Sequence, residues 1–312
     1  MEYTEFHDFS ISKLSLGTVA LGIDYGIFKH QVKPKSQESF KILSHALKYG
    51  INTLDTARTY GEAESLIGEH FTQDEKKKLT IITKFKISKA GIINKDIARK
   101  EALESLRTSL LHLKLDKVPI CLFHMDPDLL INQVLEILPE LFIELKNEGL
   151  IDHAGISVYW PEDIESCLEH SIIEAIQAPI NIFDQRLLNA NVLTKMKLKN
   201  KLFFARSVFM KGLLLMDPAS LKGNLVKAIP FIKRLHELAE LSKISVAQLI
   251  FSYVRDLNGV TSIVLGVEKT EQIEQNIQLY HGPALTKELR ELIDKSFKNI
   301  PEEIITPKYW IP

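Results

Sequence analysis

Four side chains of the kinds that transfer protons stand near the ends of apolar runs. Asp55, Lys84 and His124 each end or follow such a run, and Tyr60 lies five residues after Asp55 in a polar loop. Taken singly, each has a structural alternative: a loop-closing acid, a packed tyrosine or a satisfied core histidine. A lysine that ends an apolar strand must be paired or face a cavity, because a buried unpaired ammonium is costly. The four residues together indicate a functional site.

These residue types suit proton transfer to a carbonyl oxygen. A phenol has an ordinary pKa of about 10, and a nearby ammonium such as Lys84 favours the phenolate and lowers that pKa. Asp55 would hold the ammonium, and an imidazole at His124 can donate a hydrogen bond to an oxygen that gains negative charge. We find no metal-ligand spacing, and Ser157 and Ser207 lack a nucleophile-elbow context. We therefore expect no metal, and a redox cofactor that supplies a hydride.

The elements that position these side chains repeat along the chain. Apolar runs alternate with amphipathic segments, and the predicted strands are 14–17, 51–54, 79–85, 118–123, 153–158, 175–180, 202–208 and 260–267. The predicted helices are 36–49, 62–71, 94–113, 130–148, 161–170, 186–196, 230–243, 245–256 and 270–280. Eight apolar strands separated by helices predict a parallel α/β fold, a (β/α)8 TIM barrel, as one domain over residues 1–312. We expect a short N-terminal hairpin before the barrel, and a C-terminal helix at 286–297 and a tail after it.

Active sites of such barrels lie at the C-terminal ends of the strands. The second, third and fourth predicted strands bring Asp55, Lys84 and His124 to this rim, and the loop after the second strand adds Tyr60. No G-x-G-x-x-G motif follows any predicted strand, which argues against a doubly wound dinucleotide-binding sheet.

Composition argues against several other classes of protein. The 312 residues carry a net charge of −1 with Lys and Arg spread out, so we expect no nucleic-acid or anionic-membrane partner. No run approaches the roughly 18 apolar residues of a transmembrane helix, and residues 1–10 lack the apolar region of a signal peptide. Cys121 and Cys167 lie within apolar patterns, as reduced core thiols do. These features predict a cytoplasmic protein.

The sequence from Leu14 to Asn276 resembles the aldo-keto reductase family. The segment 50–61 is similar to its second-strand signature, 82–84 to its lysine strand, 109–124 to its helix–strand–histidine block, and 149–157 to its block ending in Gly-hydrophobic-Ser. Gln177 with Asn181, and Gln272 to Asn276 after Gly266, resemble its later cofactor contacts. The segments 157–159 and 205–213 resemble bacterial members associated with sugar and surface-polysaccharide metabolism.

The resemblance implies a catalytic role for each of the four residues. Tyr60 would be the general acid in carbonyl reduction, and Lys84 would lower its pKa. Asp55 would position Lys84, and His124 would orient and polarise the carbonyl.

The resemblance also implies a nicotinamide cofactor. The implied contacts are Gly17, Thr18, Asp55, Ser157, Gln177, Arg206, Ser207, Phe209, Gly212, Gly266, Gln272, Gln275 and Asn276. Among these, Ser157 and Gln177 would hold the carboxamide. Arg206 stands where many members have a tyrosine that stacks on the nicotinamide, and a guanidinium plane can stack there as well.

Fewer residues bear on the choice between NADP(H) and NAD(H). Many NADP-preferring members have a basic residue where this chain has Gly266 and Gln272, so bidentate recognition of a 2′-phosphate is not evident. Lys269 or Lys211 could serve instead, and Glu268 could oppose the phosphate. Because the family mostly uses NADP(H), we expect NADP(H), with NAD(H) as the alternative.

The expected activity is the NAD(P)H-dependent reduction of an aldehyde or ketone, for which a sugar or nucleotide-sugar carbonyl is one candidate. Predicted substrate contacts are Tyr25, Phe28, Tyr159 and Trp160, with Trp310 in the tail. Two alternatives stay open: a nicotinamide-binding regulatory subunit similar to the channel β-subunits of the same family, and a cofactor-free barrel such as a phosphate-binding lyase or isomerase. The sequence does not predict the oligomeric state.

Overall fold

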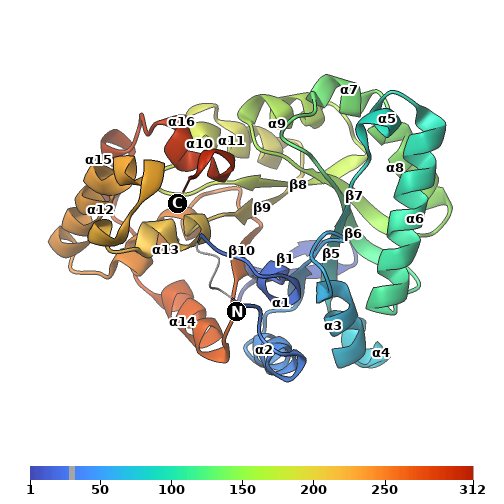
Figure 1. The fold of residues 1–312 in the computed structure, drawn as a ribbon, viewed down its shortest axis with the longest axis horizontal. Coiled ribbons are helices and arrows are strands. Elements are labelled where there is room, and N and C mark those ends of the chain that lie inside the picture. Colours follow the sequence, from blue (N-terminus) through green and yellow to red (C-terminus); the bar gives the residue numbers. More distant parts are fainter. Residues whose placement is uncertain (28–31, 312) are drawn as a thin grey trace.

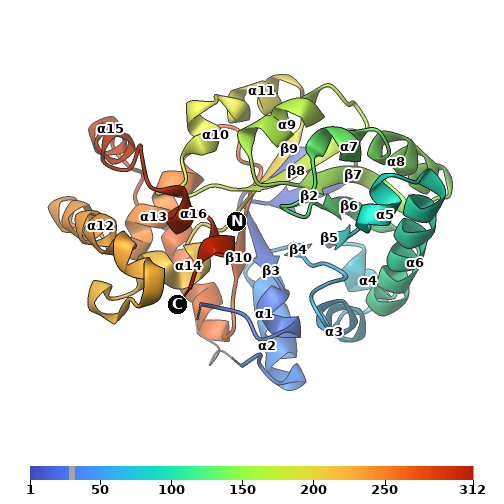
Figure 2. The ribbon, with the colours of Figure 1, turned by 45° about the horizontal axis from the view of Figure 1, so that its top comes forward.

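The computed structural model describes residues 1–27 and 32–311, and it shows a closed parallel barrel surrounded by helices (Figures 1 and 2). The barrel strands are β3 (Leu14–Gly17), β4 (Thr53–Asp55), β5 (Thr80–Phe85), β6 (Val118–His124), β7 (Ile151–Ser157), β8 (Ile173–Pro179), β9 (Leu202–Arg206) and β10 (Ser262–Gly266). Each strand pairs in parallel with the next, and β10 closes the barrel by pairing with β3. The predicted TIM barrel is confirmed.

The outer layer consists of helices that follow the strands in turn. The main ones are α2 (Ser36–Lys48), α3 (Ala63–His70), α6 (Lys95–Leu113), α8 (Leu138–Asn147), α9 (Pro161–Leu168), α11 (Val192–Leu198), α13 (Val246–Arg255) and α14 (Thr270–His281), with α12 (Ile229–Leu241) and α15 (Lys287–Ser296) added late in the chain. Shorter helices are α1 (Val19–Gly22), α4 (Gln73–Lys76), α5 (Lys89–Ile92), α7 (Ile131–Leu135), α10 (Arg186–Asn189) and α16 (Glu302–Ile305). No helix among the described residues is long and apolar enough to cross a membrane.

The N-terminal hairpin closes one end of the barrel. Its antiparallel strands are β1 (Tyr3–Phe6) and β2 (Phe9–Ser12), as predicted. Phe6 and Ile11 of the hairpin belong to one buried apolar cluster with residues of the barrel strands, namely Ile82, Ile120, Leu122, Ala175, Leu202 and Phe204. With the N-terminal end filled, the opposite end carries the polar strand termini.

Two helices predicted as continuous are broken. The segment 130–148 divides into α7 and α8, because Pro139 in the first turn of α8 has no N–H with which to continue the helical hydrogen bonds of α7. The segment 186–196 divides into α10 and α11 at Asn191, whose φ of 54° is left-handed. The segment between β3 and α2 contains the short helix α1, which contacts the loop that carries Tyr60.

Candidate active site

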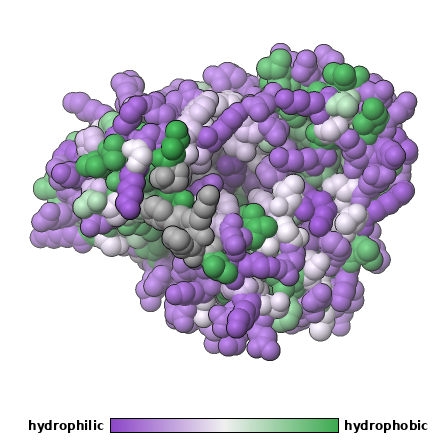
Figure 3. Space-filling view, viewed as in Figure 1, coloured by the Kyte–Doolittle hydropathy of each residue, from purple (hydrophilic) through white to green (hydrophobic). Residues whose placement is uncertain are grey.

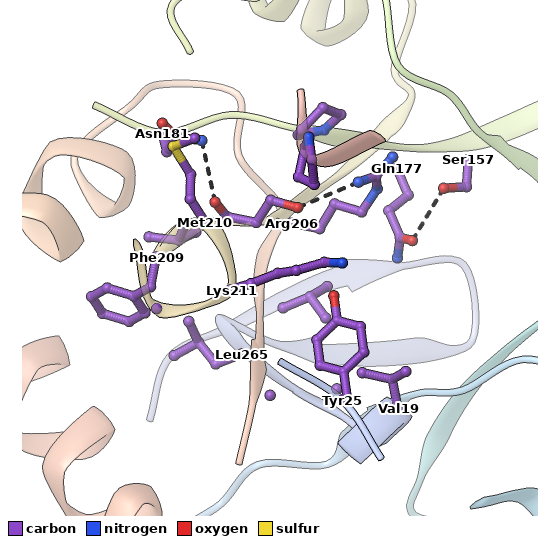
Figure 4. A pocket seen from close by; sticks show the side chains of 18 of the residues that line it. Val19, Tyr25, Ser157, Gln177, Asn181, Arg206, Phe209, Met210, Lys211 and Leu265 are labelled. Carbon is purple, nitrogen blue, oxygen red and sulfur yellow. Dashed lines mark hydrogen bonds between the residues drawn. The ribbon is translucent and has the colours of Figure 1, made fainter. Parts of the chain in front are cut away.

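The C-terminal ends of the barrel strands surround one cavity of about 620 Å³. Asp55, Tyr60 and His124 line it, together with residues that follow β7, β8, β9 and β10. Figure 4 shows side chains from these elements converging on the cavity, and Figure 3 shows a hollow near the centre of the face seen in Figure 1. A concave site of this volume is the size that small-molecule ligands occupy.

A chain of hydrogen bonds centred on Asp55 joins four strands, β4, β5, β7 and β8, beneath the cavity. The Lys84 ammonium donates to Asp55 Oδ1 over 2.6 Å and to the Thr56 carbonyl over 2.9 Å. Gln177 Nε2 donates to the same Asp55 oxygen over 2.7 Å, and Ser157 Oγ donates to Gln177 Oε1 over 3.3 Å. The pairing of Lys84 meets the sequence expectation that a lysine in this apolar strand needs a partner, since only 1% of Lys84 is exposed.

Tyr60 and His124 lie above this chain. The Lys84 ammonium is 5.1 Å from the centre of the Tyr60 ring. The rings of Tyr60 and His124 meet edge-on, with centroids 6.3 Å apart. His124 Nδ1 is buried without a hydrogen-bond partner among the described residues, which leaves Nε2 as the nitrogen that can donate to a ligand. The structure thus brings the four predicted residues together at the base of the cavity.

The electrostatics of the site differ from the sequence expectation in one respect. Burial, reinforced by the Asp55 carboxylate, raises the pKa of Tyr60, although Arg206 acts in the opposite direction. The net shift is therefore upward, because desolvation is the largest effect and the Lys84 charge is already paired with Asp55. That Lys84 lowers the pKa of Tyr60 during the reaction stays a prediction.

Burial also lowers the pKa values of Lys84 and His124. For Lys84 the paired Asp55 carboxylate opposes this shift and favours the ammonium. Burial and the nearby charges of Lys84, Lys86 and Arg206 lower the pKa of His124 to about 2. A neutral imidazole and a neutral phenol are both hydrogen-bond donors at neutral pH.

The loop that carries Tyr60 is fixed by close backbone contact with α1. A Cβ atom on Gly22 would lie 1.8 Å from the Tyr60 carbonyl oxygen, and one on Gly61 would lie 2.3 Å from the Gly22 carbonyl oxygen. Gly61 also has a left-handed φ of 56°, which glycine adopts readily. Only glycine at both positions allows α1 to approach the tyrosine loop this closely.

A buried acid supports the same loop from behind. Glu64 is fully buried at the start of α3, and its carboxylate accepts hydrogen bonds from Arg58 and, over 2.6 Å, from Thr83. Because Thr83 precedes Lys84 on β5 and Arg58 precedes Tyr60, Glu64 ties the two parts of the site together. Sequence reasoning missed this residue, whose signal was an acid in an otherwise apolar helix face.

Most predicted cofactor residues line the cavity, and three do not. Those that line it are Gly17, Asp55, Ser157, Gln177, Arg206, Ser207, Phe209, Gly212, Gly266 and Gln272. Thr18 is buried, and both its N–H and its hydroxyl donate to the Asp55 carbonyl. Gln275 and Asn276 lie on α14 away from the cavity. Thr18 therefore positions Asp55, and a cofactor contact by any of these three stays a prediction.

The segment after β9 forms a strained wall of the cavity. Ser207, Met210 and Lys211 have left-handed φ angles of 62°, 49° and 54°, which non-glycine residues rarely adopt. Asn181 Nδ2 donates to the Ser207 carbonyl over 3.2 Å and holds this turn (Figure 4). Strain of this kind clusters at ligand-binding sites.

Arg206 and Lys211 bring positive charge to this wall. The Arg206 guanidinium lies 4.7 Å from the centre of the Tyr159 ring and donates to the carbonyl of Val158 and the hydroxyl of Ser207. The Lys211 ammonium lies 5.1 Å from the centre of the Tyr25 ring (Figure 4). Anionic groups of a ligand would be attracted here.

The predicted substrate residues are placed as follows. Tyr25, Tyr159 and Trp160 line the cavity, whereas Phe28 lies outside the described residues. Trp310 does not line it, because its indole N–H donates to the Ile304 carbonyl. Residues 305–309 of the tail line the cavity instead, and a substrate contact by the tail stays a prediction.

The residues present fit a nicotinamide dinucleotide. A Cβ atom on Gly212 or Gly266 would meet no other atom within 4 Å, so the backbone there is open to the cavity for close approach by a ligand. Ser157 and Gln177 offer buried amide and hydroxyl groups beside the four polar residues. The barrel, the polar cluster and the open glycine backbone along the cavity together indicate a nicotinamide-dependent oxidoreductase of the TIM-barrel type.

Comparison with known proteins gives the family. Residues 13–297 match the Aldo/keto reductase family, and the chain belongs to it. It is 27% identical over 308 residues to the uncharacterized oxidoreductase YqkF of Bacillus subtilis, covering 90% of this chain and 91% of that protein. It is 25% identical over 319 residues to an L-glyceraldehyde 3-phosphate reductase of Escherichia coli, covering 90% and 89%.

A solved structure supports the fold. The holo form of an aldo-keto reductase from Bacillus halodurans superposes with a TM-score of 0.77 at 22% identity, covering 98% of this chain and 99% of that one. Family membership confirms the predicted resemblance and implies an NAD(P)H-dependent oxidoreductase that reduces carbonyl groups.

Proposed function

We propose that this protein reduces an aldehyde or ketone to an alcohol, with Tyr60 as the proton donor. One observation carries the proposal: the Lys84 ammonium lies between the Asp55 carboxylate and the Tyr60 ring at the base of the cavity, with His124 beside them. Bound nicotinamide would supply the hydride. Ser157 and Gln177 would hold its carboxamide, and Arg206, Ser207, Phe209 and Gly212 would line the dinucleotide.

Each residue of the site has a step that suits its geometry. His124, neutral at physiological pH, would donate a hydrogen bond from Nε2 to the carbonyl oxygen and fix its position. Tyr60 would transfer its proton to that oxygen, and its raised pKa keeps the phenol protonated before transfer. The Lys84 ammonium would then stabilise the phenolate left behind, while Asp55 holds Lys84 in place.

The preference between NADP(H) and NAD(H) depends on the residues that line the cavity after β10. We retain NADP(H) as the family-based expectation, but Glu268 lines the cavity there while Lys269 does not. The side-chain oxygen of Gln272 already accepts hydrogen bonds from the backbone N–H groups of Glu268 and Lys269. A carboxylate repels a 2′-phosphate and accepts hydrogen bonds from a ribose hydroxyl, so Glu268 favours the second candidate, NAD(H).

For the substrate we propose a small hydroxylated aldehyde or ketone, such as a sugar or nucleotide-sugar carbonyl. Tyr25, Tyr159 and Trp160 offer aromatic faces near Tyr60, and Lys308 of the tail adds a polar rim. The relative in Escherichia coli is named for a phosphorylated aldehyde, which is a carbonyl compound of the same general kind.

The test combines cofactor binding with turnover. Titration with NADH and NADPH, followed by nicotinamide fluorescence, should show saturable binding of at least one cofactor. A panel of sugars and simple aldehydes should then oxidise the bound cofactor, and Tyr60→Phe should abolish this. Cofactor binding without turnover on any substrate would instead support a regulatory subunit, and no binding would support a cofactor-free barrel.

A further inference from the structure

A second cluster of metal-ligating side chains lies at the opposite end of the barrel. His7 in the turn of the N-terminal hairpin, His153 on β7 and Glu174 on β8 each offer one donor atom, and these atoms all lie within 4.8 Å of one another. No sequence spacing predicts the cluster, because its members come from three distant parts of the chain. It is separate from the candidate active site, since the hairpin covers the N-terminal end of the barrel.

We propose that His7, His153 and Glu174 bind a divalent transition-metal ion of the Zn²⁺ class and thereby fasten the hairpin to the barrel. Two imidazoles and a carboxylate are a ligand set that Zn²⁺ accepts, with water in the remaining position.

The distances fit this coordination. His153 Nδ1 and Glu174 Oε1 are 3.0 Å apart. Two donors on a tetrahedral Zn²⁺ with bonds of about 2.0–2.1 Å are about 3.3 Å apart, so this pair already has nearly the required separation. A metal ion between these two atoms would take the place of their hydrogen bond.

The third proposed ligand, His7, lies over the ring of His153. The rings of His7 and His153 stack at 5.0 Å between centroids with planes 19° apart. His7 has a left-handed φ of 50°, a backbone conformation that is uncommon for a non-glycine residue. Its exposed side chain can shift toward an ion, whereas His153 is fixed among Phe6 and Phe9.

The carboxylate is held in place by its neighbours. Glu174 Oε1 lies 3.0 Å from His153 Nδ1, and Oε2 accepts a hydrogen bond from the Ala154 N–H over 3.3 Å. Lys146 donates to the same oxygen, Oε2, over 2.6 Å. Lys146 therefore orients the carboxylate through Oε2, as second-shell groups do in metal sites, while Oε1 faces His153.

The experiment titrates Zn²⁺ into chelator-treated protein in the presence of a weak competing indicator, and it follows both metal binding and the melting temperature. We expect one equivalent to bind and to raise the melting temperature of the wild type. His7→Phe keeps an aromatic ring on His153 but removes a ligand, so the affinity should fall at least tenfold. His281→Ala, which changes an exposed histidine at the end of α14, serves as the matched control and should bind as the wild type does.

Two results would overturn the proposal: no saturable binding by the wild type, or equal affinity in His7→Phe and wild type. Carbonyl reduction measured in parallel should be the same in both proteins, so this test is independent of the proposed activity.

Discussion

Substitutions in the buried Lys84–Asp55 ion pair can show separately what the pair contributes to folding stability and to carbonyl reduction. In Lys84→Met the side chain keeps its approximate volume but loses the ammonium, so the Asp55 carboxylate is left buried with only Gln177 donating to Oδ1. Breaking a buried ion pair by removing one partner costs about 3–5 kcal/mol. We expect the lower end, about 3 kcal/mol, because the hydrogen bond from Gln177 remains.

This loss of stability should appear as a lower melting temperature, Tm. With about 2.1 cal/mol/K of unfolding entropy per residue over 312 residues, a loss of about 3 kcal/mol lowers Tm by about 5 °C. Calorimetry of the wild type, Lys84→Met and the double variant Lys84→Met with Asp55→Asn measures it. The double variant carries no unpaired buried charge, so it should recover most of the lost Tm and still lack carbonyl reduction.

The reasoning would be refuted if Lys84→Met melted within about 1 °C of the wild type, or if the double variant melted lower than the single one. The first result would mean that the buried pair adds nothing to the folded state. The second would mean that the charges do not compensate each other.

Three further predictions concern other residues of the site. Burial lowers the pKa of His124 from an ordinary 6.5 to about 2, so between these pH values the unfolded chain binds more protons than the folded one. The free energy of unfolding should therefore fall by up to about 1.4 kcal/mol for each pH unit that the pH is lowered from 6.5 towards 2. His124→Gln should flatten this part of the stability curve measured with denaturant, and an unchanged slope would contradict the assignment. Glu268→Gln should tighten NADPH relative to NADH in fluorescence titrations, and an unchanged ratio would remove Glu268 from cofactor selection. Glu64→Gln should lower kcat about tenfold or more with little change in cofactor Kd, because it loosens the tie between the tyrosine loop and β5; a change in Tm without a change in kcat would make Glu64 merely structural.

The barrel could be predicted because its signals are local. Near-continuous apolar runs such as that of β5 are buried on both faces, and each is followed by an amphipathic helix. The strand ends then identify Asp55, Lys84 and His124, since the fold itself brings these positions to one rim.

The parts that were missed depend on contacts between distant segments. The packing of α1 on the tyrosine loop is set by Gly22 against Tyr60, a contact that no periodicity encodes. The pKa of Tyr60 depends mainly on how deeply the ring is buried, and this burial is not evident from the sequence. The tail contacts at 305–309 likewise depend on where the chain returns after the last barrel helix.

The most direct test of the central claim is a single-turnover experiment on Tyr60→Phe. Protein loaded with reduced nicotinamide is mixed with excess carbonyl substrate, and cofactor oxidation is followed by fluorescence. If Tyr60 is the proton donor, the rate of this step should fall by about 10²–10⁴-fold while the cofactor Kd stays unchanged. An unchanged rate in Tyr60→Phe would contradict the account, because the proton would then come from another group.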